Sequence, residues 1–217
     1  MEQRIRKEFR ALLAPWLLAL LLASTALWWR PGTSENAAWI LWLASFSLGM
    51  VLLAVAAFGK EFSHGTILAL LAQPISRSRL WLEKAGVLAL AMLAVLLAFN
   101  VVVYYSLGAD HPVCAYLAHH PAARVGLLVS VAAWSGGLCS TLLLRQMISA
   151  FWMALLLPIS LGLTLEYAGG KFFPPQSAGT WWIVALVVYS GVAGLGSWWL
   201  CLRYQDTQRL RDRKSVV

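Results

Sequence analysis

The sequence predicts an all-α, polytopic membrane protein with six transmembrane helices. Two observations lead to this prediction. Of the 217 residues, 60% are hydrophobic and only 12% are charged, whereas a soluble domain needs about a quarter of its residues charged to cover its surface. The apolar residues also gather in runs of about 20, the length that a helix needs to cross a hydrocarbon core of about 30 Å.

Each apolar run is rich in Leu, Ala and Val and lacks the polar-apolar alternation of barrel strands, so the spans are expected to be helices. The first run follows a basic head, as a secretory signal does, but it is longer than a signal core and ends in Trp-Trp-Arg-Pro. We therefore expect an uncleaved first span and treat residues 1–217 as one transmembrane domain. The predicted spans are residues 11–29, 37–58, 85–107, 124–144, 147–168 and 181–202.

The distribution of Lys and Arg predicts the orientation. Six spans place both termini on one side, together with residues 60–84, the turn at Arg145 and the tail 203–217, and these segments carry most of the basic residues. The opposite side keeps only Arg30, Arg124 and Lys171. By the positive-inside rule, both termini are expected in the cytoplasm, with the protein in the plasma (cytoplasmic) membrane. The net charge of +8 then reflects topology, and no nucleic acid partner is expected.

Residues 1–10 mix Ile5 and Phe9, four positions apart, with basic side chains. This spacing suits a short helix on the inner membrane surface, in contact with membrane lipids. A merely basic tail that helps to orient the first span is the alternative.

Few residues suggest chemistry. The sequence has no P-loop motif and no H-E-x-x-H zinc motif, and its three cysteines lack metal-like spacing. The pair His119-His120, with Asp110 and His111, is either an extracytoplasmic metal site or a group of solvated loop residues. No catalytic residue and no cofactor of this chain is predicted.

Glu166, in the fifth apolar run, is the most notable charge within a span. It is either a residue of a substrate pathway or a carboxylate that reaches the outer interface and pairs with Lys171. Asn100, in the third run, is expected to form an interhelical hydrogen bond. Trp134 lies in mid-span and is expected to pack between helices.

Residues 158–175 contain Pro158, two adjacent glycines and two adjacent prolines. They predict a broken or re-entrant outer element, and the alternative is a kinked helix followed by a loop.

Residues 60–84 separate the second and third spans. Within them, Ile67, Leu68, Leu70 and Leu71 crowd one side of two helical turns, which end at Gln73-Pro74 because a residue before proline avoids the α conformation. Ser76 then caps a second helix that continues into the third span. The first helix is too short to cross the bilayer. It either contacts a partner or rests on the membrane or on its own protein.

The pattern E-F-S-H-G-T-I-L-A-L-L-A-Q-P-I-S-R at residues 61–77, followed by a lysine, resembles the loop between the second and third spans of type-2 ABC transporter permeases. The rest of the chain resembles these proteins in outline, with a basic N-terminal segment, six spans and an interrupted connection between the fifth and sixth spans. The matching residues are Glu61, Gly65, Thr66, Leu70, Leu71, Pro74, Ser76, Arg77 and Lys84.

The resemblance implies that the short helix is a coupling helix, which rests in a cleft of a separate ABC ATPase subunit. That subunit would bind ATP and Mg, and this chain would be a non-catalytic permease subunit of an exporter, paired with a second copy or a homologous permease. A non-transporting scaffold or assembly factor and an intramembrane enzyme remain the alternatives. The partner-contact residues that the resemblance implies are Glu61, Gly65, Thr66, Ile67, Leu70, Leu71, Pro74 and Arg77.

Overall fold

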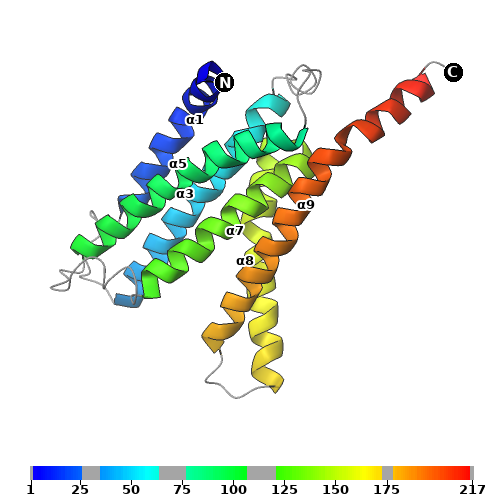
Figure 1. The fold of residues 1–217 in the computed structure, drawn as a ribbon. Helices are drawn as coiled ribbons and strands as arrows, with labels where there is room; N and C mark the ends of the chain where they lie inside the picture. The colour runs from blue at the N-terminus through cyan, green and yellow to red at the C-terminus, as the bar shows by residue number, and fades with distance from the viewer. Residues whose placement is uncertain (1, 26–34, 64–76, 107–120, 173–177, 216–217) are drawn as a thin grey trace.

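Six helices form an elongated bundle in the computed structural model (Figure 1), which describes residues 2–25, 35–63, 77–106, 121–172 and 178–215. These ranges contain no strand, so the prediction of an all-α protein is confirmed. The helices are α1 (Glu2–Ala23), α3 (Glu35–Ser63), α5 (Arg77–Ser106), α7 (Pro121–Leu144), α8 (Met147–Phe172) and α9 (Ala178–Ser215).

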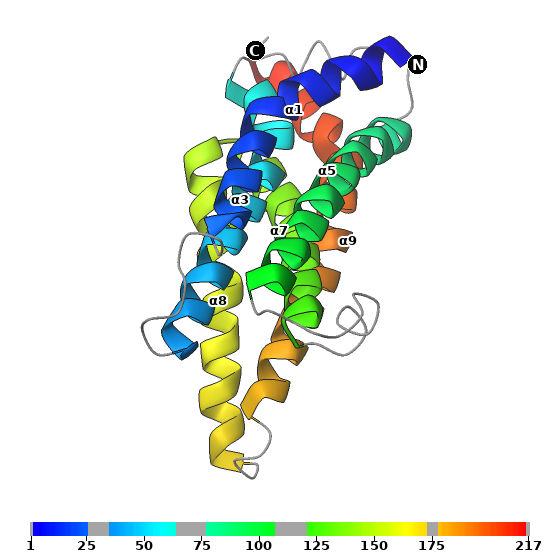
Figure 2. The same ribbon diagram turned by 90° about the vertical axis from the view of Figure 1, so that its left-hand side faces the viewer.

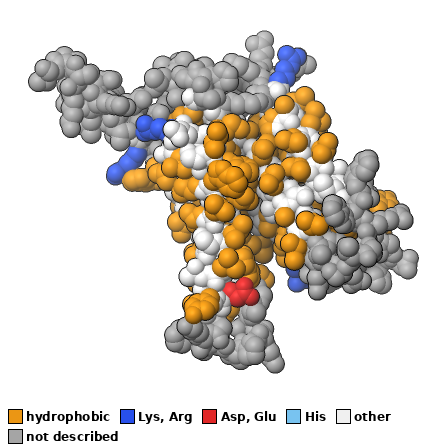
Figure 3. Space-filling model, turned by 180° about the vertical axis from the view of Figure 1, so that it is seen from behind, with side chains coloured by type: hydrophobic (Ala, Val, Ile, Leu, Met, Phe, Trp, Pro, Cys, Tyr) orange, Lys and Arg blue, Asp and Glu red, His pale blue; other side chains and the backbone are white. Residues whose placement is uncertain are grey.

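Five of the described helices are long and apolar enough to cross a membrane, namely α3, α5, α7, α8 and α9. Hydrophobic side chains occupy much of the described face drawn in Figure 3, as expected of a multi-pass membrane protein. The described apolar part of α1, Leu12–Ala23, is shorter than a span. The predicted first span, 11–29, runs into residues outside the described ranges. Its crossing of the membrane, and with it the total of six spans, therefore stays a prediction.

Both chain ends lie at the same end of the bundle, which we call the terminus end (Figure 1). The helix α3 ends there, α5 begins there, and α7 turns into α8 there through Arg145 and Gln146. These are the segments that the basic residues group together in the sequence. The start of α1 lies across the terminus end before the helix descends along the bundle (Figure 2).

The helix α7 lies at the centre and contacts α3, α5, α8 and α9. Two adjacent glycines permit this close packing. A Cβ atom at Gly137 would overlap the Cβ of Ala54 on α3 and lie 3.2 Å from its backbone carbon, while one at Gly136 would overlap the hydroxyl of Tyr189 on α9. Small residues allow helix backbones to approach in membranes, where burial of apolar surface supplies no drive for association.

The helix α8 continues through Pro158 to Phe172, so the predicted broken element is wrong over these residues. Proline removes one backbone hydrogen bond, but neighbouring polar side chains can re-engage freed backbone groups in a transmembrane helix. Pro158 leaves the Ala154 carbonyl without its usual backbone donor. The nearby Ser160 hydroxyl donates to a different carbonyl of the same helix, that of Leu157, with an Oγ to O distance of 2.9 Å. The end of the segment, residues 173–177, lies outside the described ranges.

The predicted interhelical hydrogen bond of Asn100 is also wrong. Its Nδ2 donates to the Leu96 carbonyl of the same helix at 2.8 Å, and its buried Oδ1 accepts no hydrogen bond from the described residues. The side chain faces the core one turn beyond Leu96, where the apolar neighbours of α5 offer few donors. Trp134, in contrast, packs between helices as predicted.

Candidate functional site

A buried ion pair joins the two helices that flank residues 64–76. Glu61 lies near the end of α3 and Lys84 lies two turns into α5, with 2.6 Å between the Lys84 Nζ and the Glu61 Oε1. The Lys84 side chain is only 3% exposed and that of Glu61 is 16% exposed. Two charges removed from water stabilise each other only at short distance, so moving the end of α3 away from α5 would leave each charge buried without compensation. The pair therefore holds these two helices together.

An aromatic ring also lies close to the lysine. The Lys84 Nζ lies 5.4 Å from the centroid of the Phe58 ring, close enough for attraction between the cation and the face of the ring. Phe58 lies one turn before Glu61 on α3 and is almost fully buried. These two partners of the Lys84 ammonium, the Glu61 carboxylate and the Phe58 ring, therefore come from the last turns of α3.

Trp81 connects the beginning of α5 to two further helices. Its ring makes edge-on contacts with Trp134 of α7, at a centroid distance of 6.0 Å, and with Trp198 of α9, at 5.1 Å. The Trp134 indole also donates to the Ala85 carbonyl at 3.2 Å. Edge-to-face aromatic pairs add about 0.5–1.5 kcal/mol each to the apolar area that they bury.

We call Phe58, Glu61, Trp81, Lys84, Trp134 and Trp198 the base cluster. It brings α3, α5, α7 and α9 together close to the end of α3 and the beginning of α5, the two helix ends that flank residues 64–76. The helix α8 begins beside it, because a Cβ atom at Gly59 of α3 would lie 3.1 Å from the Met147 Cγ. A displacement of the end of α3 or the beginning of α5 would therefore reach every helix from α3 to α9.

The base cluster includes one of the predicted partner-contact residues, Glu61. Arg77 begins α5 as predicted, but its side chain is not among those that the structure describes. The remaining predicted contacts lie outside the described residues, and the structure leaves them as predictions: Gly65, Thr66, Ile67, Leu70, Leu71 and Pro74.

Sequence reasoning missed Phe58, Trp81 and Trp198 as members of the site. A local signal exists for the first two, because Phe58 and Glu61, like Trp81 and Lys84, are three positions apart and share a helix face. Trp198 has no such signal, since it lies far from Trp81 in the sequence.

Glu166 lies at the far end of the bundle, opposite the terminus end. The Trp182 indole donates to its Oε2 at 2.6 Å and so joins α8 to α9. The Trp182 ring lies so close to Gly162 that a Cβ atom there would overlap it. The carboxylate thus has a structural partner on α9. The Lys171 side chain is not among those that the structure describes, so the predicted pairing of Glu166 with Lys171 stays a prediction.

The described residues contain no group of three or more His, Cys, Asp or Glu side chains able to hold a metal ion. His111, His119, His120 and Asp110 lie outside these residues, so the predicted alternatives for them stay open.

The chain matches no protein-family model and no curated protein sequence. A functional proposal therefore depends on the base cluster and on the sequence pattern of residues 61–84.

Proposed function

We propose that the chain is the membrane-spanning subunit of an ATP-driven ABC exporter. In this proposal a separate ATPase subunit binds ATP and Mg, docks on residues 64–76 and drives translocation, while this chain has no catalytic residue. The chain pairs with a second copy or a homologous permease in the plasma membrane, with both termini in the cytoplasm. The observation that supports it best is the buried Glu61–Lys84 pair at the base of the predicted docking segment.

A docking segment that transmits movement needs a stiff base, since a flexible base would absorb the displacement. The helices on either side meet this requirement. The 29 residues of α3 and the 30 residues of α5 are each continuous, which gives lengths of about 45 Å at a rise of about 1.5 Å per residue. Each helix is therefore long enough to run from the base cluster across the bilayer.

The contacts of Trp81 support the same proposal. Through Trp134 and Trp198, the start of α5 touches α7 and α9, so a push on the docking segment would not be confined to two helices. Packed interfaces shift between discrete arrangements rather than deform continuously, and this is how small displacements at one site become larger movements elsewhere.

Affinity purification in mild detergent tests the proposal. An ATPase subunit should co-purify in equal amount with the unchanged chain. Leu70→Asp or Leu71→Asp should abolish this association, or uncouple ATP hydrolysis from transport, while membrane insertion is retained. Gln73→Asp is the matched control, because it places the same charge at a polar position of the same segment. A chain that inserts normally and yields no ATPase would refute the proposal.

A further inference from the structure

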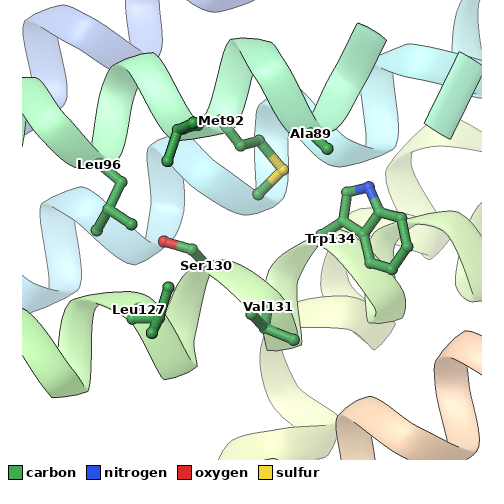
Figure 4. A pocket seen from close by; sticks show the side chains of 8 residues that line it. Ala89, Met92, Leu96, Leu127, Ser130, Val131 and Trp134 are labelled. Atoms are coloured by element: carbon green, nitrogen blue, oxygen red, sulfur yellow. The ribbon is translucent and has the colours of Figure 1, made fainter. Parts of the chain in front are cut away.

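A groove of about 280 Å³ lies between α5 and α7 (Figure 4). The two helices touch at both ends of it. At one end, the Trp134 indole donates to the Ala85 carbonyl at 3.2 Å. At the other end, a Cβ atom at Gly126 would lie 3.3 Å from a methyl carbon of Leu96. Between these contacts the helices separate. The groove is lined by Ala89, Met92, Leu93, Leu96, Leu127, Ser130, Val131 and Trp134.

The lining is suited to hydrocarbon. Its only hydroxyl, on Ser130, donates to the Gly126 carbonyl at 2.7 Å, and the Trp134 indole donates to Ala85. Both polar side chains therefore have their protons engaged within the protein. The other lining residues are apolar, and Met92 adds a flexible side chain that adapts to irregular shapes.

The depth of the groove excludes a lipid headgroup. Trp134 is ten residues from the end of α7 at Leu144, or about 15 Å along the helix, and Leu127 is about 25 Å from it. In a hydrocarbon core of about 30 Å, the groove thus lies from the middle toward the far side. Only the hydrocarbon part of an amphipathic molecule reaches this depth without removing a polar group from water.

We propose that the groove holds the end of an acyl chain from a membrane lipid. The groove opens on a surface of exposed side chains, among them Leu90, Leu93 and Leu127, which are 70%, 49% and 52% exposed and face the hydrocarbon of a membrane. An acyl chain enters from this surface without crossing the protein. An unfilled groove would forfeit dispersion contacts along its walls.

The size of the groove favours a single chain over a helix of a second copy. The lining residues extend about 10 Å along each helix, because seven residues separate the first from the last on α5 and on α7. A volume of about 280 Å³ over this length gives a cross-section of about 28 Å². A helix about 10 Å wide has a cross-section of about 80 Å², so it would pack over the groove without filling it.

Photolabelling with lipids tests this inference, and it requires neither an ATPase nor transport. The full chain is reconstituted in phosphatidylcholine nanodiscs that contain a phospholipid with a diazirine near the end of one acyl chain. A second probe carries the diazirine beside the headgroup. After irradiation, peptide mass spectrometry should place the chain-end adducts mainly on 89–96 and 127–134. The headgroup-side probe should not label the mid-membrane end of the groove, at Ala89, Met92 and Trp134.

Two substitutions that fill the groove, Ala89→Phe and Val131→Phe, should remove most of the chain-end label. Ala44→Phe is the control, because Ala44 is exposed on α3, outside the groove. All variants are first compared by size-exclusion chromatography, and a folded filling variant suffices for the test. Label spread evenly over all exposed faces, label retained by a folded filling variant, or protein-protein crosslinks through the groove would each overturn the inference.

Discussion

Replacement of Lys84 by Met removes the cation of the base cluster and leaves the Glu61 carboxylate in a largely buried position. Loss of one partner from a buried ion pair costs about 3–5 kcal/mol in folding free energy. Because the Glu61 side chain keeps 16% exposure, water solvates the remaining charge in part, so we expect the lower end, about 3 kcal/mol. Lost attraction between the ammonium and the Phe58 ring adds about 1 kcal/mol.

For a chain of this size, about 1 kcal/mol changes the unfolding midpoint by about 2–4 °C, so Lys84→Met should lower it by about 10 °C. Thermal unfolding of the purified protein in detergent measures this shift. The double variant Glu61→Met/Lys84→Met removes both charges and retains similar side-chain volumes, so it should recover most of the loss. If the double variant is as unstable as the sum of the two single variants, the two side chains are not coupled and the reasoning is refuted.

Three further predictions concern packing and backbone geometry. Gly137→Leu should abolish the monodisperse size-exclusion peak, because the new Cβ overlaps the Ala54 Cβ and lies 3.2 Å from the Ala54 backbone carbon of α3. Gly191→Leu, at a position with open space around it, should retain that peak. Trp182→Phe leaves the Glu166 carboxylate without its indole donor and should lower the unfolding midpoint by about 5 °C. In a chain that already carries Glu166→Gln, the acceptor is neutral, so Trp182→Phe should lower the midpoint by less. Arg145 has a φ of 56°, so Arg145→Gly should raise the midpoint by about 3 °C, while an unchanged or lower midpoint would contradict this account.

Local patterns in the sequence predict much of the helical fold. Apolar length locates the helices, and the proline and serine before Arg77 place the start of α5 at the residue where the structure has it. The end of α3 is harder to predict, because the charges at Lys60 and Glu61 end the apolar run at Phe58. The helix continues to Ser63, with the Glu61 charge balanced by Lys84 at a distance of 23 residues in the sequence.

Contacts between distant parts of the chain explain what sequence reasoning missed. Trp81 meets Trp134 and Trp198 only because α5, α7 and α9 converge, and no spacing within one helix encodes this convergence. Pro158 shows the opposite error, since the local rule predicts a break and the membrane context keeps α8 helical. The partner of Glu166 that sequence reasoning missed, Trp182, lies across the hairpin on α9.

Experiments on the base cluster also distinguish a transporter from a scaffold that merely binds a partner. A scaffold needs only a docking surface, whereas a transporter must pass movement through Trp81 to α7 and α9. Labelling of a cysteine introduced at Tyr167, which is 70% exposed on α8, should depend on ATP in the complex if the chain is a transporter. Trp198→Leu removes one of the contacts of Trp81, so it should weaken this dependence while the ATPase still co-purifies. If the labelling rate does not depend on ATP in the otherwise unchanged complex, the scaffold is favoured, because the bound ATPase then causes no movement at the far end of the bundle.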